Sequence, residues 1–533
     1  MQPRQKLDAL TSLRFFAAAL IVALHTSDAF SVFNIEQYVT ASKAVSFFFV
    51  LSGFILSYAY RQFNSTGSLH KFYVARFARL WPLHVVTAAY WLGVAYSVNP
   101  EAVYINDGLE KLFANLTLIQ AWVPLQSWQA SINAVSWSIS VEVFFYLLFP
   151  FLANKFQTHW KHIFIAESLI LIALIYIALT QNFNEDINRS SLLYFFPPAR
   201  LFEFTAGIAA YHIAQKLSVM DLSIIKRHGT MVEVVALLVS ASNIALSKYL
   251  AFGQSILGTG VTIYINAAWS ALAFAFTILV FSISSGRITK MLCFAPLTFL
   301  GEASFALYLC HYPTIYLISS FPNVFGTGEM AYYQAWAYSI VLACILYKTI
   351  ESPARNAIVN IYISKNKLKT IAIFAACIIY ISSITLTSVK VKETILPENL
   401  FTTGTSDKIV FDCGATISKI SVDKPYSKYA VFTFTTQSTC KEKNLMLAVL
   451  IHSKDGSYIN TGAYKLYNKG SNTYTIKTQT PINNFMNAES LVIAAYEDVT
   501  ALIPVTTPNR DASGIRAIVP VNNGKREVRE YTQ

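Results

Sequence analysis

LDALTSLRFFAAALIVALH, residues 7–25, is the stretch of sequence that decides the fold. It begins an apolar run of about 20 residues, which is the length that a helix needs to cross a bilayer. Arg4 and Lys6 precede it, as in a signal peptide, but Arg14 interrupts the run and no small-residue cleavage site follows Ser27. We therefore predict that this segment is retained as a first membrane-spanning helix.

The rest of the chain is also rich in apolar segments. Of the 533 residues, 54% are apolar and only 13% are charged, about half the charged share of a soluble protein. An apolar stretch at 111–125 is short and predicts a re-entrant or interfacial segment. Eleven spans are predicted, at 10–28, 43–60, 80–97, 135–154, 161–180, 194–215, 229–246, 266–284, 297–319, 333–352 and 368–388.

The positions of lysine and arginine predict the orientation of these spans, because basic residues collect in cytoplasmic loops. With the N-terminus in the cytoplasm, the outside loops hold four: Lys43, Lys111, Arg189 and Lys248. The inside loops hold seventeen: Arg4, Lys6, Arg61, Lys71, Arg76, Arg79, Lys155, Lys161, Lys216, Lys226, Arg227, Arg287, Lys290, Arg355, Lys365, Lys367 and Lys369. The net charge of +12 is therefore explained by basic residues in the cytoplasmic loops of a membrane protein. A nucleic-acid partner is not expected, because no basic, aromatic-laced soluble module is present.

The chain changes character after the last predicted span. An odd number of spans places this part outside the cytoplasm, and short alternating runs such as YAVFTFTT and SLVIAAYE are typical of strands. We predict an extracytoplasmic β-sandwich-like domain. A disulfide between Cys413 and Cys440 would be possible in an oxidising compartment, and no spacing of cysteine and histidine indicates a metal site. The predicted organisation is a membrane core at 1–360, an eleventh helix at 361–389, a linker at 390–405, the β-rich domain at 406–520 and a flexible tail at 521–533.

Ionisable side chains inside spans are costly and indicate function. Arg14 and His25 are eleven residues apart, so they share one helix face and differ in depth by about 16 Å. Glu142 lies about two turns into the fourth span, at a depth compatible with His25. A His25–Glu142 pair would orient the imidazole and raise its basicity. The alternatives are an Arg14 that snorkels, a His25 at the interface, and a purely structural ion pair.

Two further spans carry polar faces. Arg200 and Glu203 are three residues apart in the sixth span, and they could serve a substrate or simply pair with each other. The ninth span carries Ser304, Tyr308 and His311 on one face. Tyr308 or His311 could donate a hydrogen bond to an oxyanion, whereas helix packing is the favoured alternative for Ser304.

Arg76 and Arg79 precede Trp81-Pro82 at the cytoplasmic start of the third span. Two guanidinium groups at a buried entrance suit a polyanion such as the phosphates of coenzyme A. Ordinary positive-inside charge or contact with lipid headgroups is the alternative.

Taken in order, these fragments resemble the acyltransferase-3 family of membrane O-acyltransferases over residues 5–360. The fragments are the Arg-x10-His pattern of Arg14 and His25, FFFVLSGFILS, FYVARFARLWP, WSISVEVFFY, ARLFEFTAG, LGEASFALYLCHYP and ESPAR at 351–355. The sequence departs from the family at the fourth span, where the family more often has two acidic residues and only Glu142 is present. No Gly-Asp-Ser motif of the esterase domain found in many members occurs after the eleventh span.

The resemblance implies a ten-helix core in a bacterial inner membrane, extended here by an eleventh helix. It implies transfer of an acyl group, most often acetyl, from cytoplasmic acetyl-CoA to a hydroxyl of an envelope glycan such as O-antigen or exopolysaccharide. His25 and Arg14 match the essential positions of the family, and Arg76 and Arg79 match its donor-binding basic cluster. We expect His25 to act as the base, with Glu142 orienting it and Arg14 assisting the donor.

Two other classes of function are compatible with parts of the sequence. Polar residues at several depths also mark transport paths, so a polytopic exporter of a glycan or small molecule is the main alternative. A protein whose exported β-rich domain is the active part, with the helices as an anchor, is the other. The β-rich domain itself could bind glycan, dock a partner or act as a structural cap.

Overall fold

The computed structural model describes residues 7–33, 41–60, 62–63, 65–98, 108–181, 187–218 and 227–363, together with separate strands between 409 and 531. The chain divides into two compact units, Met1–Thr387 and Ser388–Gln533. In the described residues, the first unit is helical and the second consists of strands. The predicted eleventh helix at 368–388, the linker at 390–405 and the Cys413–Cys440 pair lie outside what the structure describes.

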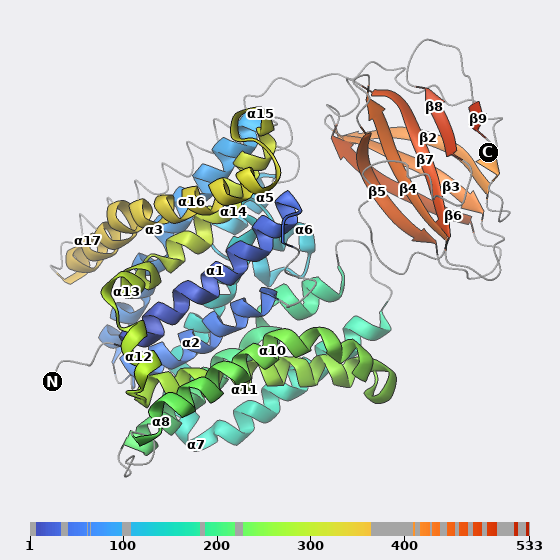
Figure 1. Cartoon of the computed structure of the whole chain (residues 1–533). Helices are drawn as coiled ribbons and strands as arrows, with labels where there is room; N and C mark the ends of the chain where they lie inside the picture. Colours follow the sequence, from blue (N-terminus) through green and yellow to red (C-terminus); the bar gives the residue numbers. More distant parts are fainter. Residues whose placement is uncertain are drawn as a thin grey trace. The chain divides into compact units, whose positions relative to one another are not determined.

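The first unit is a bundle of helices of very different lengths (Figure 1). Its α-helices are α1 (Asp8–Phe30), α2 (Ala44–Ala59), α3 (Thr66–Val98), α5 (Leu109–Leu116), α6 (Gln126–Gln129), α7 (Trp137–Thr180), α8 (Leu201–Ser218), α10 (Gly229–Leu257), α11 (Thr259–Ile283), α12 (Arg287–Leu292), α13 (Ala295–Glu302), α14 (Ser304–Ser320), α15 (Pro322–Phe325), α16 (Gly328–Leu346) and α17 (Ser352–Ile363). Shorter turns are the 3₁₀ helices η2 (Ala41–Lys43), η3 (Gln120–Trp122), η4 (Ala134–Ser136) and η6 (Pro197–Arg200), and the π-helices η5 (Ser191–Phe195) and η7 (Tyr347–Glu351).

Several of these helices are apolar enough to cross a membrane. By length and composition, four described helical segments qualify: Asp8–Phe30, Ala134–Thr180, Thr259–Ile283 and Gly328–Tyr362. Ala44–Ala59 and Gly229–Ala245 are shorter apolar helices. These features are those of a multi-pass membrane protein, in which helices satisfy the backbone without water.

The structure corrects the boundaries of two predicted spans. The spans at 135–154 and 161–180 are the two arms of α7, which non-helical geometry at His159 (φ −123°, ψ 16°) separates at the predicted break. The span at 194–215 becomes α-helical only at Leu201, because Pro197 and Pro198 open the 3₁₀ turn η6 and cannot donate backbone hydrogen bonds. The span at 297–319 is divided at Ala303 into α13 and α14. The apolar stretch at 111–125 forms α5 and η3, so it is not a full span.

The centre of the bundle is a core of buried aromatic rings. The Phe145 ring lies edge-on to Phe49, with centroids 5.3 Å apart, and stacks on Phe204 at 4.7 Å. Phe149 meets Phe204 edge-on at 6.1 Å. Since these rings come from α2, α7 and α8, they fix the three helices against one another.

Glycines allow the closest helix contacts. A Cβ on Gly53 of α2 would overlap the backbone carbonyl of Phe204 in α8, and a Cβ on Gly207 of α8 would overlap the carbonyl of Val50 in α2. The same holds for Gly301 of α13 against the Thr11 carbonyl of α1. Small residues at such crossings let backbones touch, as is common in membrane bundles. Gly53, Gly207 and Gly301 thus mark backbone-to-backbone contacts between helices.

The second unit contains two antiparallel sheets. One has the order β1-β2-β3-β6 and the other β5-β4-β7-β8-β9. The strands are β1 (Ile409–Val410), β2 (Thr416–Tyr426), β3 (Tyr429–Gln437), β4 (Leu445–Ser453), β5 (Tyr458–Leu466), β6 (Thr473–Pro481), β7 (Ala488–Glu497), β8 (Arg516–Pro520) and β9 (Arg529–Tyr531). A β-sandwich and the flexible tail at 521–533 stay predictions.

Replacing Gly207 by alanine tests the α2–α8 contact. The added Cβ has only backbone atoms to meet, which cannot rotate away, so we expect a loss of about 1–3 kcal/mol in stability, seen as a lower unfolding temperature in detergent. Gly93→Ala on α3 is the matched control, because a Cβ there has no atom within 4 Å. Both changes raise helix propensity equally, so equal unfolding temperatures for the two variants would contradict the proposed contact.

Candidate active site

Two cavities open within the helical unit. The first, here called the arginine cavity, has a volume of about 380 Å³ and is lined by Arg14, Arg76, Arg79 and Arg355, with Glu142 among its other residues. The second, here called the histidine cavity, has a volume of about 730 Å³, and His25 is part of its wall. Both volumes lie near or within the range of small-molecule sites. Residues from α1 and α2 contribute to both cavities.

The four arginines of the arginine cavity differ in their partners. Arg79 forms an ion pair with Glu351, whose side chain is fully buried. The π-helix η7 carries this glutamate, and π-helical turns often mark functional sites. Arg76 lies over the rings of Tyr60 and Tyr146, 5.9 and 5.8 Å from their centroids.

The Nε atom of Arg76 is buried and has no hydrogen-bond partner among the described residues. Arg14 and Arg355 likewise have no hydrogen-bonded acceptor within the described ranges. A buried polar group without a partner is costly, so these guanidinium groups are suited to an anionic ligand. Arg79 is less available than predicted, because Glu351 already neutralises it.

Glu142 lies on the wall of the arginine cavity, not beside His25. One carboxylate oxygen accepts a hydrogen bond from Ser52 Oγ at 3.0 Å. His25 instead contacts His311, with 2.8 Å between Nδ1 of the first and Nε2 of the second. The predicted His25–Glu142 pair is therefore wrong, since α14 supplies the partner of the imidazole in place of α7.

The histidine cavity has an aromatic wall. The His25 and His311 rings are nearly parallel, at 8°, and Tyr312 meets His25 edge-on at 5.5 Å. Asp28 lies on α1 near His25 and also lines the cavity. The other aromatic residues of the wall are Trp137, Tyr194, Phe195, Tyr308 and Tyr316. The cavity thus combines flat apolar faces with a carboxylate and an imidazole.

Tyr308 and Val45 line both cavities, so they form the partition between them. The Tyr308 hydroxyl donates to the Val135 carbonyl at 2.9 Å and accepts from Ser138 Oγ at 2.9 Å. Because its hydrogen is already donated, Tyr308 is poorly placed to serve as the predicted oxyanion donor. Its side chain instead separates the arginine cavity from the histidine cavity.

Ser304 lines neither cavity. Its Oγ donates to the Gly301 carbonyl at 2.7 Å across the junction of α13 and α14, and the side chain is fully buried. These contacts fit the alternative in which Ser304 serves helix packing.

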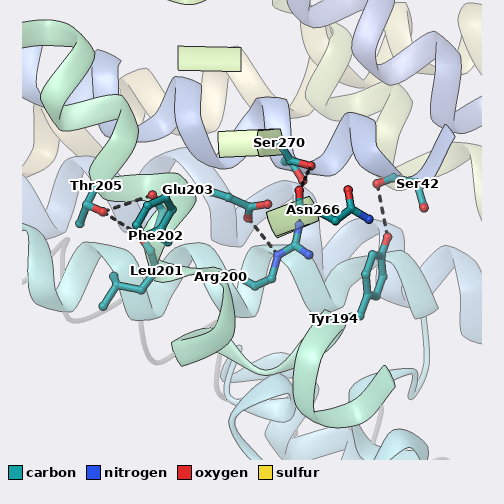
Figure 2. Close-up of polar contacts among 10 residues, drawn as sticks. Ser42, Tyr194, Arg200, Leu201, Phe202, Glu203, Thr205, Asn266 and Ser270 are labelled. Atoms are coloured by element: carbon teal, nitrogen blue, oxygen red, sulfur yellow. Dashed lines mark hydrogen bonds and ion pairs between the residues drawn. The ribbon is translucent and has the colours of Figure 1, made fainter. Parts of the chain in front are cut away.

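Arg200 and Glu203 pair with each other, as Figure 2 shows. Their Nε and Oε2 atoms are 3.0 Å apart, and Arg200 Nη2 donates to Ser46 Oγ at 3.0 Å. The guanidinium carbon lies 5.3 Å from the centroid of the Tyr194 ring. Neither Arg200 nor Glu203 lines either of the two cavities, and the pair contacts the histidine cavity only through the Tyr194 ring.

Sequence reasoning gave no role to Glu351, Arg355 or Asp28. Glu351 and Arg355 stand four residues apart at the end of an apolar run, in the ESPAR fragment. Charged residues at the end of a predicted span could have indicated that they belong to the site. Asp28 follows His25 by three residues on the same helix. That spacing places both on one face and could have identified it.

Comparison with known proteins gives a consistent result. A family model described as an acyltransferase domain matches residues 7–348. Acyltransferase MdmB of Streptomyces mycarofaciens is 28% identical over 392 residues, covering 66% of this chain and 93% of that protein. O-acetyltransferase OatA of Staphylococcus aureus is 25% identical and peptidoglycan O-acetyltransferase OatA of Listeria monocytogenes 22% identical. This similarity covers 66% and 67% of the chain and 57% of each relative. No solved structure matches.

The ion pair between Arg79 and Glu351 can be tested by Glu351→Gln. Removing one partner of a buried pair costs about 3–5 kcal/mol. We expect the low end or less, because 18% of the Arg79 side chain is exposed. The measurement is the unfolding temperature of the purified protein.

Glu302→Gln is the control for this change. Glu302 lines the same cavity and accepts a hydrogen bond from the Tyr347 hydroxyl at 2.7 Å, which an amide oxygen can also accept. It should be nearly neutral, and Arg79→Gln combined with Glu351→Gln should cost less than the sum of the single changes. Additive effects in the double variant would show that the pair is not coupled.

Proposed function

The chain belongs to the acyltransferase-3 family and is a membrane O-acyltransferase, and on this premise we propose its donor, acceptor and mechanism. We propose that it moves an acetyl group from cytoplasmic acetyl-CoA to a hydroxyl of an envelope glycan. The observation that carries this proposal is the pair of adjoining cavities, one cationic and one aromatic, which share Tyr308 and Val45. Each cavity suits one substrate, and the reacting groups would meet at the partition.

The arginine cavity is the proposed donor site. Arg76 lies in the first half of α3 and Arg355 near the start of α17, and both belong to the basic residues whose distribution predicts the cytoplasmic side. Guanidinium groups bind phosphate oxygens through paired, charge-assisted hydrogen bonds. A cavity of about 380 Å³ suits the acyl-thioester arm of the donor, with the nucleotide phosphates nearer the mouth.

The histidine cavity is the proposed acceptor site. Aromatic residues present flat apolar faces with polar edges, and a sugar ring is divided in the same way into C–H faces and a hydroxyl rim. The names of two relatives, O-acetyltransferase and peptidoglycan O-acetyltransferase, describe acetyl transfer by those proteins, in one case to a glycan-containing polymer. They support the same substrate class for this chain.

His25 is the proposed general base. It takes the proton of the acceptor hydroxyl while the oxygen attacks the thioester carbonyl, and the carbon–sulfur bond then breaks. The thiolate of coenzyme A receives a proton, so one ester and one thiol form from one alcohol and one thioester. General base catalysis of this kind typically contributes a factor of ~10²–10⁴ in rate. Arg14, on the same helix but in the donor cavity, would stabilise negative charge on the donor.

The strand-rich second unit is proposed to lie outside the cytoplasm, next to a bacterial inner membrane whose cytoplasmic face carries the N-terminus. The similarity to acyltransferase MdmB takes up 93% of that protein but only 66% of this chain. This supports a second unit that is dispensable for the chemistry and that captures glycan or docks a partner.

Loss of the base should abolish transfer. We expect cells with the wild-type protein to show an acetyl mass gain on envelope glycans by mass spectrometry and proton NMR, and cells with His25→Ala at matched expression to show none. His212→Ala on α8, whose ring contacts Gln157, is the control and should retain the gain. An undiminished gain with His25→Ala would remove His25 as the base.

The donor site can be tested with two donors, of which one carries the phosphates and adenosine of coenzyme A and the other lacks both. Arg76→Gln should raise the KM for acetyl-CoA roughly 10- to 100-fold, the equivalent of about one charged hydrogen bond. With acetyl-pantetheine, which lacks those phosphates, wild type and Arg76→Gln should have similar KM values. The same relative loss with both donors would show that Arg76 acts on structure and not on phosphate.

A further inference from the structure

A chain of three groups links the backbone of α14 to His25. The Leu307 carbonyl lies 3.2 Å from His311 Nδ1. His311 Nε2 in turn lies 2.8 Å from His25 Nδ1. His311 is fully buried and contributes to neither cavity wall. The sequence predicted it as an oxyanion donor, but its contacts give it a different position, behind His25.

The hydrogen positions along this chain follow from what each atom can do. A carbonyl oxygen only accepts, so His311 Nδ1 carries a hydrogen and donates it to Leu307. A neutral imidazole then has a lone pair on its other nitrogen, and His311 Nε2 must accept. His25 Nδ1 must therefore carry the hydrogen that lies between the two rings. The opposite arrangement would set a nitrogen lone pair against the carbonyl lone pairs of Leu307.

We propose that His311 is a positioning residue that fixes the tautomer of His25, with Nδ1 protonated and Nε2 free to act as the base. No hydrogen bond within the described residues uses His25 Nε2, and His25 lines the histidine cavity. A backbone carbonyl and a second imidazole thus take the place that a carboxylate has in the Ser-His-Asp arrangement. This inference deepens the proposed function and rests on it for the identity of the reaction.

The chain of hydrogen bonds from Leu307 through His311 to His25, here called the relay, carries no net charge. This affects how the proton leaves His25. When His25 takes a proton from the acceptor hydroxyl, both of its nitrogens carry hydrogen, and His311 still accepts from Nδ1. Among the described residues, no carboxylate is hydrogen-bonded to either imidazole, and Asp28, which lines the same cavity, is exposed. The proton is therefore readily passed on to the leaving thiolate. The hydroxyl loses its proton, the thiol gains one, and His25 returns to its starting tautomer.

The first test compares two replacements of His311 in the full-length protein. Glutamine has an amide oxygen that can accept from His25 Nδ1 and an NH₂ group that can donate to Leu307. Phenylalanine keeps a ring of similar shape but can do neither. We expect His311→Gln to keep kcat within about tenfold of wild type and His311→Phe to lower it by ~10²–10⁴, the range of general base catalysis.

The KM for acetyl-CoA should stay unchanged in both variants, because the donor cavity does not include His311. Equal kcat values for the two variants, or a loss confined to KM, would overturn the proposal. If His311→Phe does not fold, as judged from its unfolding temperature, His311→Leu replaces it.

The second test reads the tautomer without any substrate. Nitrogen-15 NMR of the histidine-labelled protein, with His25 assigned by its absence in His25→Ala, should show a protonated Nδ1 and a bare Nε2 in wild type. His311→Phe should give a mixture of tautomers. A protonated Nε2 in the wild type would overturn the relay even if the enzyme is active. The predicted tautomer in a protein that transfers no acyl group would instead reject the proposed function and keep the relay.

Discussion

Charged and polar groups that are removed from water must find partners inside the protein, and inside a bilayer this constraint is at its strongest. The helical unit meets it by dividing the arginines around its interior into two kinds. Glu351 with Arg79, and Glu203 with Arg200, neutralise each other. Arg14, Arg76 and Arg355 keep no hydrogen-bonded acceptor among the described residues and face one cavity. The groups that are left unsatisfied therefore mark the place where a ligand supplies the missing charge.

The same sorting separates the two cavities chemically. The arginine cavity gathers cations around a small volume, whereas the histidine cavity is wide and aromatic and has an imidazole backed by another imidazole. A carboxylate beside His25 would have placed an anion near the partition. Glu142 lies on the other side of it, where four arginines surround the same cavity. An anionic donor and an uncharged hydroxyl are thus offered separate environments.

The sequence predicted well which residues share a face of one helix. It predicted poorly which residues of two different helices contact each other. The spacing of Arg14 and His25 placed them on one face at different depths, and each indeed lines a different cavity. The partner of His25 could not be deduced, because helical periodicity does not say which helix lies next to which. Glu142 was predicted at a compatible depth, and only the packing of α14 against α1 shows that His311 is the partner instead. Breaks within predicted spans, such as the one at Ala303 between α13 and α14 and the π-turn η7, were missed because they interrupt the helical hydrogen-bond pattern without interrupting the apolar sequence pattern.

The glycine contacts between α2 and α8 carry a further meaning for motion. Gly53 and Gly207 bring backbone against backbone, with no side chain between them that could change rotamer. These two helices are therefore expected to move together as one rigid unit. Of the two, only α2 contributes to the histidine cavity, through Val45, whereas α1 and α14, joined by the two imidazoles, supply half of its lining residues. A separation of α1 from α14 would therefore widen the cavity. Such a movement for a bulky acceptor would lengthen the hydrogen bond between His25 and His311. Entry of the acceptor would thus be coupled to the tautomer of the base.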